Sequence, residues 1–398
     1  MGNLPVRVST ALPTGVAALL FESARARRQL EGRLTALVEG HGYAEAILPI
    51  LDYLEPYESL LSPASRGELY RFIDRDGEQL ALRADFTPML ARLLAPRLAS
   101  LQLPLRLFYR GDVVRYAENR PGGRRELYQM GVELLGMGRP AASDAAEPVT
   151  AAAAMVATAA AAEREVLELF LAALTGGDGP RPSGGPRDGV GAADAVDAAD
   201  AVDAADAADA PQVVLGLAGC LDSALAAAAT ATGLPVAELA TAVARRERSV
   251  VRRAGGVLLA IVEAGVPAAP EELGAPAAAR LRWLLALRDE LAGRFPGVRL
   301  SVDLAEFARF SRHPDLVAEA GARSYYDGLV FQAYAGAAAV PVGAGGRYGS
   351  LFRALGADID AVGFSLNLDG LLEAGQTAAA APAVARRGTT AGSGGGPR

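Results

Sequence analysis

The sequence predicts an α+β fold in which a mostly antiparallel sheet is flanked by helices. Long strand patterns follow each other within 105–136 and again within 325–368, and helical patterns do not alternate strictly with them. Strict alternation would favour a parallel, doubly wound sheet instead. The clearest unit is a hairpin over 105–136, whose two arms are rich in Val, Tyr, Leu and Phe around the turn-forming run 119–123.

The second arm of this hairpin sorts its side chains onto two faces. Because alternate residues of a strand share a face, Gln129, Gly131 and Glu133 point the same way. The glycine leaves room for a ligand to approach the sheet between an amide and a carboxylate. We interpret this face as the floor of a binding site. A plain surface hairpin, with its polar side chains in water, is the alternative.

The segment before the hairpin predicts an arm, a helix and an edge strand. Residues 1–15 have an extended pattern, and 16–40 carry one apolar stripe with arginines opposite, which is typical of an amphipathic helix. Residues 43–51 are strand-like up to Pro49. A proline is tolerated at a sheet edge or a bulge, so this strand is also a candidate subunit contact.

A short hairpin then leads into a helix that begins beside two polar side chains. Residues 67–84 contain two strand patterns around an Asp-Gly turn. In the run that follows, Asp85 and Thr87 are two residues apart, so an extended backbone points both to one side. Pro88 fits the first turn of the next helix.

The second half of the chain is predicted to continue around a low-complexity insert. The expected elements are a helix over 146–174, a strand from Gln212, helices over 221–294, strands over 298–307, 325–334 and 361–368, and a glycine-rich turn at the end of 340–347. The insert, 175–211, is first Gly/Pro-rich and then repeats aspartate every three residues among alanines and valines. We expect an acidic, solvated segment without chemistry of its own; a metal-binding acidic repeat is the alternative. The tail, 375–398, is expected to be disordered.

Composition restricts the class of protein. Of the 398 residues, 51% are hydrophobic and 21% charged, as expected for a soluble globular protein. The net charge of −7 argues against binding to a nucleic-acid backbone. A single cysteine, Cys220, permits no internal disulfide and fits a reducing cytoplasm.

Other features of the sequence argue against a metal, a membrane or secretion. The two histidines, His41 and His313, and the single cysteine give no metal-binding spacing. The N-terminus has no secretory pattern, and no apolar run is long enough to span a membrane. We therefore expect a cytoplasmic protein without a metal or a cofactor.

Four motifs together resemble the catalytic core of class II aminoacyl-tRNA synthetases, specifically histidyl-tRNA synthetase. GYAEAILPILDYLEPY at 42–57 is similar to the first motif, whose proline lies in the dimer interface. LALRADFTPMLAR at 80–92 is similar to the amino-acid-binding segment LRPDFT. The hairpin has the Arg-loop-Gln-Glu layout of the second motif. SYYDGLVFQAY, GAGGRYGSLFRALG and AVGFSLNLDGLL, within 324–372, are similar to the histidine-specific segment and the third motif.

Departures from the synthetase pattern argue against amino-acid activation. The synthetases carry an arginine four residues before the tyrosine pair, where this chain has Gly321, and a phosphate-clamping arginine in the third motif, where it has Gly370. Glycine cannot replace a guanidinium that stabilises developing phosphate charge. We also expect no anticodon-binding domain. The expected organisation is one catalytically inactive core domain over 1–374, interrupted by the insert and followed by the tail.

The residues that would hold the amino acid are retained. By position in the motifs, the resemblance implies a histidine site made of Asp85, Thr87, Arg115, Gln129, Glu133, Tyr325 and Tyr326. Carboxylates and an amide suit an α-ammonium group, and an arginine suits an α-carboxylate. A tyrosine hydroxyl or an acid can bond the imidazole nitrogens. Adjacent strand residues point opposite ways, so only one tyrosine is expected to line the pocket.

A synthetase-like core without its activating arginines resembles the regulatory subunits of ATP phosphoribosyltransferase. This resemblance implies a non-catalytic protein that forms a hetero-oligomer with a short-form catalytic subunit and dimerises through its first motif. It also implies binding of L-histidine, no binding of tRNA, and feedback inhibition of the first step of histidine biosynthesis. A truncated or divergent histidyl-tRNA synthetase is the alternative, and a paralogue that aminoacylates another molecule is a third hypothesis. Both require histidyl-adenylate formation.

Overall fold

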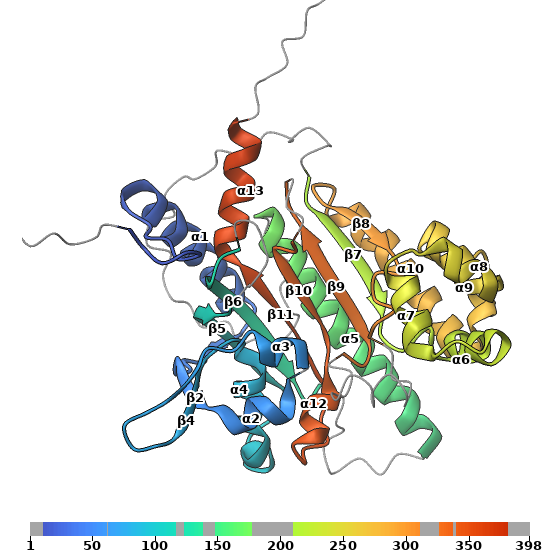
Figure 1. Cartoon of the computed structure of the whole chain (residues 1–398), viewed down its shortest axis with the longest axis horizontal. Coiled ribbons are helices and arrows are strands. Elements are labelled where there is room, and N and C mark those ends of the chain that lie inside the picture. Colours follow the sequence, from blue (N-terminus) through green and yellow to red (C-terminus); the bar gives the residue numbers. More distant parts are fainter. Residues whose placement is uncertain are drawn as a thin grey trace, which may run out of the picture.

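The computed structural model describes residues 11–61, 63–116, 123–137, 148–176, 210–310, 326–336 and 340–380. Its main sheet consists of β1 (Ala44–Glu45), β5 (Leu105–Val114), β6 (Glu126–Leu135), β7 (Gln212–Leu217), β8 (Arg299–Val302), β9 (Leu329–Tyr334), β10 (Gly343–Arg347) and β11 (Ala361–Asn367). The strand order is β1-β5-β6-β11-β10-β9-β7-β8 (Figure 1). Among the described strands, only β1–β5 and β7–β8 are parallel pairs. The predicted α+β fold with a mostly antiparallel sheet is therefore confirmed.

The hairpin β5–β6 forms where the sequence predicts it, and its register builds one polar face. Each arm has 10 residues; Tyr109 pairs with Gly131, and Leu107 pairs with Glu133. On the other side of β6, Gly363 of β11 lies opposite Glu133. Glu133 is therefore enclosed by a neighbouring strand on each side.

The segment GAGGR forms strand β10, and the prediction of a glycine-rich turn there is wrong. A Cβ at Gly345 would come within 2.5 Å of Phe331 Cζ and of the Gly363 carbonyl oxygen. A Cβ at Gly343 would approach the ring of Phe170 at 2.9 Å. Glycine occupies these positions because neighbouring groups crowd the strand, and a sequence pattern does not distinguish crowding from chain reversal.

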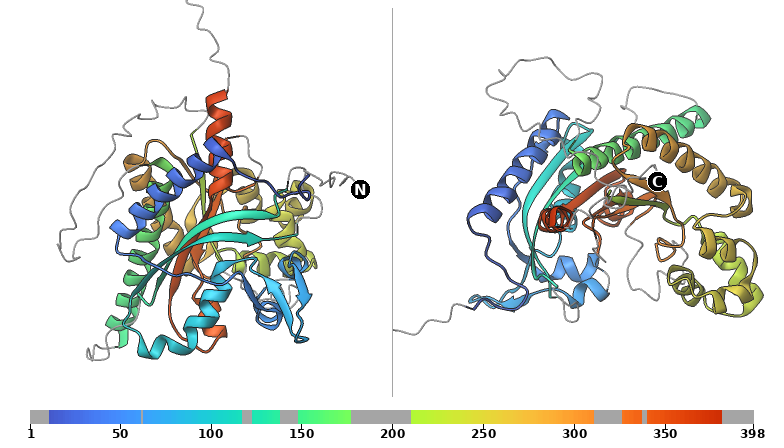
Figure 2. Two further views of the ribbon diagram at one scale, coloured as in Figure 1. Left: turned by 90° about the vertical axis from the view of Figure 1, so that its left-hand side faces the viewer. Right: turned by 90° about the horizontal axis from the view of Figure 1, so that it is seen from above.

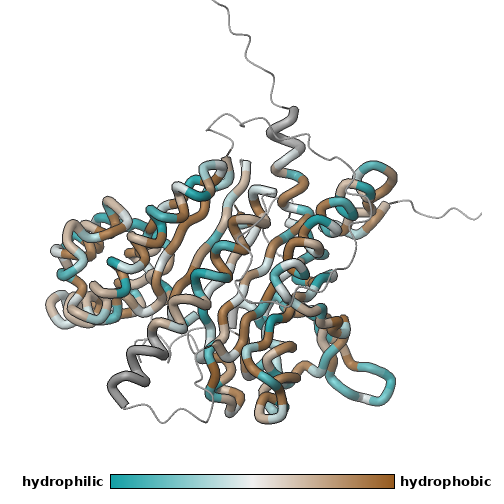
Figure 3. Tube along the Cα trace, turned by 180° about the vertical axis from the view of Figure 1, so that it is seen from behind, coloured by the Kyte–Doolittle hydropathy of each residue, from teal (hydrophilic) through white to brown (hydrophobic). Residues whose placement is uncertain are grey.

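Four helices cover one face of the sheet, which we call the back face. They are α1 (Phe21–Gly40), α5 (Pro148–Thr175), α10 (Ala275–Arg294) and α13 (Leu368–Ala380). Figure 2 shows α1, α5 and α10 along one side of the strands. Seen from behind, mostly apolar strands lie between helices of mixed hydropathy (Figure 3). Phe170 of α5 packs here against Phe331 and Phe364, with ring centroids 4.8 and 5.1 Å apart.

The opposite face, which we call the front face, carries a small second sheet and short helices. This sheet has the order β2-β4-β3 and consists of β2 (Leu51–Tyr53), β3 (Arg71–Ile73) and β4 (Gln79–Leu82). The short helices are α2 (Leu54–Leu60), α3 (Pro63–Gly67), α4 (Phe86–Leu94) and α12 (Gly349–Ala354). The hairpin predicted over 67–84 is thus confirmed, whereas the strand predicted over 43–51 is divided into β1 and β2 around Pro49.

A group of helices lies beyond the β8 edge of the sheet (Figure 1). It contains α6 (Asp222–Thr232), α7 (Val236–Ala244), α8 (Arg248–Ala254) and α9 (Gly256–Ala264). Within the described part of the chain, no single helix has the length and hydropathy to cross a bilayer. Taken together, α6 and α7 meet that test, but they bend by 117° where they join.

Two terminal predictions differ from the structure in detail. The first helix begins at Phe21 instead of residue 16, because the preceding segment is held as an arm: Gly15 O accepts from the Arg125 backbone N–H at 2.7 Å. At the other end, α13 continues to Ala380, into the segment expected to be disordered. Residues 177–209 and 381–398 lie outside the described ranges.

Candidate functional site

Glu133 is a fully enclosed polar residue on the front face, with a relative exposure of 1%. Thr87 Oγ1 donates to its Oε1 at 2.8 Å, and the Tyr348 hydroxyl donates to its Oε2. Gly363 makes room for this carboxylate, because a Cβ at that position would overlap Oε2. A carboxylate offers about four lone-pair positions. Each oxygen therefore keeps capacity to accept from a ligand.

Asp85 and Thr87 enter the site from the start of α4. Asp85 is the N-cap residue of this helix, and its Oδ1 accepts from the Thr87 backbone N–H at 3.1 Å. Aspartate is among the preferred N-cap residues because it satisfies one of the free N–H groups of the first turn. The Asp85 side chain is 35% exposed, whereas Thr87 is buried. Asp85 therefore lies at the mouth of the site and Thr87 in its wall.

Tyr109 and Tyr348 belong to this site, although the sequence did not single them out. The Tyr109 hydroxyl lies 3.5 Å from Thr87 Oγ1, and a Cβ at Gly131 would come within 2.5 Å of it. The sequence pattern could have indicated Tyr109, because it pairs with Gly131, the glycine of the polar face. Tyr348 donates a hydrogen bond to Glu133, which lies 215 positions earlier in the chain, and no local sequence pattern predicts such a contact.

Arg115 and Gln129 lie toward the loop end of the hairpin. Arg115 Nε donates to the Ala84 carbonyl oxygen at 2.7 Å, and its guanidinium is 3.9 Å from Asp85 Oδ2. Gln129 is buried on the same face as Glu133. Alternate strand residues are about 7 Å apart, so this row spans about 14 Å. It is long enough to contact opposite ends of one small zwitterion.

Tyr326 closes the site from the segment before β9. A Cβ at Gly346 would approach its ring at 2.8 Å, so the ring lies directly on the front face of β10. Burial, and then the charges of Asp85 and Glu133, raises the pKa of the Tyr326 hydroxyl well above its usual range. The hydroxyl therefore stays protonated and can donate. Tyr325 lies outside the described residues.

The electrostatics of the site favour a ligand that brings N–H donors or a positive charge. Burial raises the pKa of the Glu133 carboxyl to about 8, although the hydrogen bonds from Tyr348 and Thr87 lower it. Asp85 raises it further. Among the described residues its hydrogen-bond partners are hydroxyl groups and not arginines. Burying a carboxylate without a cation costs free energy, which a cationic ligand would offset.

Folding stability without ligand is expected to fall as the pH rises through the Glu133 titration. The unfolded carboxyl has a pKa near 4.5 and the folded one a pKa of about 8. Between these values the folded state holds a proton that the unfolded state releases, so rising pH favours unfolding. Urea unfolding of wild type and Glu133→Gln across this window should show wild type losing stability relative to the variant. A constant difference would contradict the assignment.

Position 370 carries no phosphate clamp. Gly370 lies in the first turn of α13, and its neighbour Asp369 is buried in an ion cluster with Arg27 and Arg124, at 3.5 and 3.4 Å. This end of the helix therefore has a structural cluster of charges, and no guanidinium extends from position 370 itself. Gly321, the other expected departure, lies outside the described residues.

Neither a metal centre nor a reactive thiol is indicated in the part of the chain that the structure describes. There, no group of three or more His, Cys, Asp or Glu side chains could hold a metal ion. Cys220 is free and buried, and burial raises the pKa of its thiol to about 12. A buried thiol of this kind is unreactive. The aspartate repeat from Asp194 to Asp209 lies outside the described residues.

Comparison with known proteins shows the family of the chain. The family model described as Histidyl-tRNA synthetase matches residues 15–176 and 198–371. A Moorella thermoacetica protein named ATP phosphoribosyltransferase regulatory subunit is 32% identical over 383 residues, covering 95% of this chain and 84% of that protein.

Two solved structures share the fold. An ATP phosphoribosyltransferase regulatory subunit/histidyl-tRNA synthetase from Bacillus halodurans aligns with a TM-score of 0.63 and 23% identity, covering 92% of this chain and 84% of that one. A chain of the ATP phosphoribosyl transferase (HisG:HisZ) complex from Thermotoga maritima aligns with a TM-score of 0.53 and 18% identity, covering 86% of this chain and 97% of that one.

Proposed function

Because this chain belongs to the histidyl-tRNA synthetase family, and within it to the ATP phosphoribosyltransferase regulatory subunits, we propose that it binds L-histidine and regulates a catalytic partner. It is a non-catalytic subunit. The observation that carries the histidine proposal is the buried Glu133 carboxylate, which accepts hydrogen bonds from the Thr87 and Tyr348 hydroxyls, with the partly exposed Asp85 and Arg115 at the same face of the sheet.

The site residues differ in exposure, and this difference suggests how histidine is oriented among them. Glu133 is enclosed, so it suits the imidazole, whose N–H can donate to a carboxylate oxygen. The Tyr326 hydroxyl is a second imidazole partner. The side chains of Asp85 and Arg115 are 35% and 33% exposed and lie at the mouth, where they suit the α-ammonium and the α-carboxylate. Thr87 and Gln129 line the space between.

The chemistry of the site supports binding without activation. Adenylate formation needs cations that stabilise charge on the reacting phosphates, and position 370, where the synthetase motif has an arginine, is a glycine. No covalent step, cofactor or tRNA contact belongs to this proposal. We treat 1–374 as one inactive core domain on the same grounds.

Regulation requires that histidine bind two states of the assembly with different affinity. The Thermotoga maritima relative occurs in a HisG:HisZ complex. By analogy, we propose that this chain assembles with a short-form ATP phosphoribosyltransferase catalytic subunit, is required for its activity, and carries feedback inhibition of the first step of histidine biosynthesis. We place this complex in the cytoplasm; the free, buried Cys220 fits a reducing compartment.

An exposed apolar surface around the first motif supports self-association. Ile47 is 87% exposed, and Ile50, Leu51 and Tyr53 are also exposed. Ile50 also lines a pocket of about 440 Å³, whose other walls include the charged side chains of Asp112, Arg124 and Glu126, so the apolar surface borders a charged hollow. Contiguous apolar patches of this kind mark protein interfaces. We propose that two copies of the chain dimerise here.

Three measurements test the proposal. Calorimetric titration with L-histidine should give a Kd in the micromolar range or weaker. Addition of the chain to a short-form catalytic subunit of the same organism should raise its turnover, and histidine should lower it again. ATP–pyrophosphate exchange with histidine should be absent. Formation of histidyl-adenylate would instead support a divergent histidyl-tRNA synthetase, and a lack of any complex would refute the regulatory role.

Asp85→Asn is expected to weaken histidine binding about tenfold, since it removes one charge-assisted hydrogen bond to the α-ammonium. Asparagine caps a helix as well as aspartate does, so α4 should keep its start. Asp74→Asn is the matched control, because Asp74 Oδ1 also accepts from nearby backbone N–H groups, at 2.9 Å, in an exposed turn. The control should bind like wild type, and calorimetry would measure both. Equal affinity of Asp85→Asn and wild type would remove Asp85 from the site.

A further inference from the structure

A chain of ion pairs lies next to Tyr326 and Tyr348 and connects the back face of the sheet with α12 on the front face. Arg347, at the end of β10, donates to Asp360 Oδ1 at 2.7 Å, and its Nε lies 3.5 Å from Asp327 Oδ1. Asp327 Oδ2 accepts from the Ser350 backbone N–H at 2.8 Å and from Arg353. These contacts connect the segment before β9, the end of β10, the start of α12 and the residue before β11.

Each end of the Asp327–Arg347 pair is covalently next to a pocket tyrosine. Tyr326 precedes Asp327, and Tyr348 follows Arg347. The Asp327 backbone N–H donates to the Arg347 carbonyl oxygen at 2.8 Å, so the two segments run side by side. The Arg347 side chain lies beside Glu163 of α5, on the back face, whereas the Tyr348 hydroxyl bonds Glu133 on the front face. The ion pairs therefore hold the same backbone that presents both tyrosines in front.

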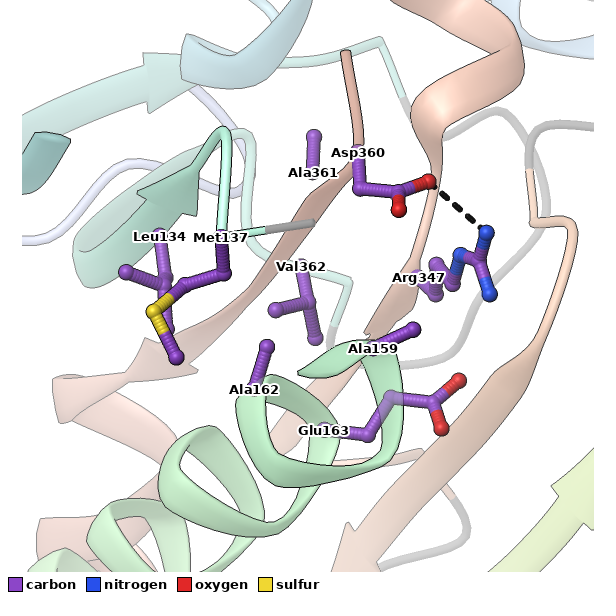
Figure 4. A pocket seen from close by; sticks show the side chains of 9 residues that line it. All are labelled: Leu134, Met137, Ala159, Ala162, Glu163, Arg347, Asp360, Ala361 and Val362. Carbon is purple, nitrogen blue, oxygen red and sulfur yellow. Dashed lines mark hydrogen bonds and ion pairs between the residues drawn. The ribbon is translucent and has the colours of Figure 1, made fainter. Parts of the chain in front are cut away.

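The side chains of this network are packed closely, so a change in one of them should shift its neighbours. Figure 4 shows Arg347 and Asp360 beside Glu163, Ala159 and Val362, around a cavity of only about 10 Å³. Such a space holds one water molecule at most. The Glu163 carboxylate, itself fully buried, accepts from the Leu329 backbone N–H at 3.0 Å and so fixes the start of β9. Loss of one charge here would leave its partners desolvated and free to move.

We propose that Asp327, Arg347 and Asp360 are positioning residues, which set the places of Tyr326 and Tyr348 in the pocket and thereby the affinity for its ligand. This inference rests on the proposed function for the identity of the ligand, L-histidine. The three residues do not touch the ligand. They act through the tyrosines, and through the hydrogen bond from Tyr348 to Glu133 in particular.

The test is a double-mutant cycle between Arg347→Gln and Tyr348→Phe in the full chain. Calorimetric titration should show that Arg347→Gln weakens histidine binding about tenfold in the wild-type background. In the Tyr348→Phe background the same substitution should cost at most about a twofold loss, because the main group through which it acts, the Tyr348 hydroxyl, is already gone. Asp360→Asn, which preserves shape, should reproduce the effect if Arg347→Gln folds poorly.

Arg106→Gln is the matched control. The Arg106–Glu165 pair lies on the same face of the sheet, with side-chain exposures of 24% and 21% against 25% and 20% for Arg347 and Asp360. It should leave histidine affinity within about twofold of wild type in both backgrounds. Wild-type affinity of Arg347→Gln, or an equal loss with and without the Tyr348 hydroxyl, would overturn the positioning role.

Unfolding measurements on wild type, the three single variants Arg347→Gln, Tyr348→Phe and Arg106→Gln, and the two double variants with Tyr348→Phe separate this inference from the proposed function. Urea unfolding without ligand should show that Arg347→Gln and Tyr348→Phe change the unfolding equilibrium non-additively, whereas Arg106→Gln and Tyr348→Phe should add. If wild type binds no histidine, the proposed function fails. The unfolding data alone then test whether Arg347 positions Tyr348. Additivity of Arg347→Gln with Tyr348→Phe would then reject the positioning role.

Discussion

Glu133→Gln is expected to weaken histidine binding about a hundredfold while the chain stays folded. Glu133 is enclosed on the front face of the sheet, and a bound imidazolium would favour its ionised form, whose oxygens are strong acceptors for an imidazole N–H. A hydrogen bond to a charged group contributes about 1.5–3 kcal/mol, which corresponds to a factor of about 10 to 150 in Kd. Glutamine keeps the shape and one acceptor oxygen. It also removes a buried charge that disfavours folding above neutral pH, so the loss of binding should not result from unfolding.

Calorimetric titration of Glu133→Gln and of Glu126→Gln measures this effect. Glu126 lies on the same strand, but its side chain is exposed on the opposite face. The Glu126→Gln variant should therefore bind histidine as wild type does. Tight binding by Glu133→Gln would show that histidine binds elsewhere, and an equal loss in both variants would indicate a general effect on β6.

Alternation along one strand was sufficient to predict which residues of β6 share a face. Gln129, Gly131 and Glu133 occur at a period of two in a long, unambiguous strand, and the structure places them in a row on one face. The Asp85 and Thr87 pair was equally local, because an N-cap and its first helical turn are set by neighbouring residues. Features that depend on a few adjacent residues were therefore accessible from the sequence.

The rest of the site depends on strand order, which no local pattern specifies. Tyr348 reaches Glu133 only because β11 and β10 follow β6 in the sheet. The glycines of β10 were read as a turn for the same reason, since the crowding that requires them comes from Phe331 and Gly363 on neighbouring strands. The first helix started late, and a hydrogen bond between Gly15 and Arg125 holds the chain directly before its predicted first residue as an arm.

Strand order also explains why one sheet can combine stability with ligand recognition. Its back face is filled by apolar side chains and paired charges, such as Arg106–Glu165. Its front face carries Glu133 with hydroxyl partners. Because successive residues alternate between the faces, a substitution behind the sheet can alter the front only through the backbone. A crowded position that touches Glu133 directly should therefore have the larger effect.

Gly363→Ala is the substitution expected to damage the chain most. Gly363 lies on β11 directly opposite Glu133, and an added Cβ would overlap both Glu133 Oε2 and the Val132 carbonyl oxygen. The first atom belongs to a side chain that could move only by breaking its hydrogen bonds. The second belongs to the backbone of a central strand and cannot move without disturbing the sheet. We expect a loss of about 3 kcal/mol or more in the free energy of unfolding, together with loss of histidine binding.

Urea unfolding measures this loss, and Gly32→Ala provides the control. Gly32 lies within α1, and a Cβ there would meet nothing within 4 Å. Since alanine favours helix over glycine by about 1 kcal/mol, the control should be slightly more stable than wild type. Combining Gly363→Ala with Glu133→Ala removes only the side-chain overlap, so stability should recover in part and histidine binding should not. Full recovery would show that the Val132 carbonyl imposes no constraint, and an undamaged single variant would show that the two strands are further apart than described.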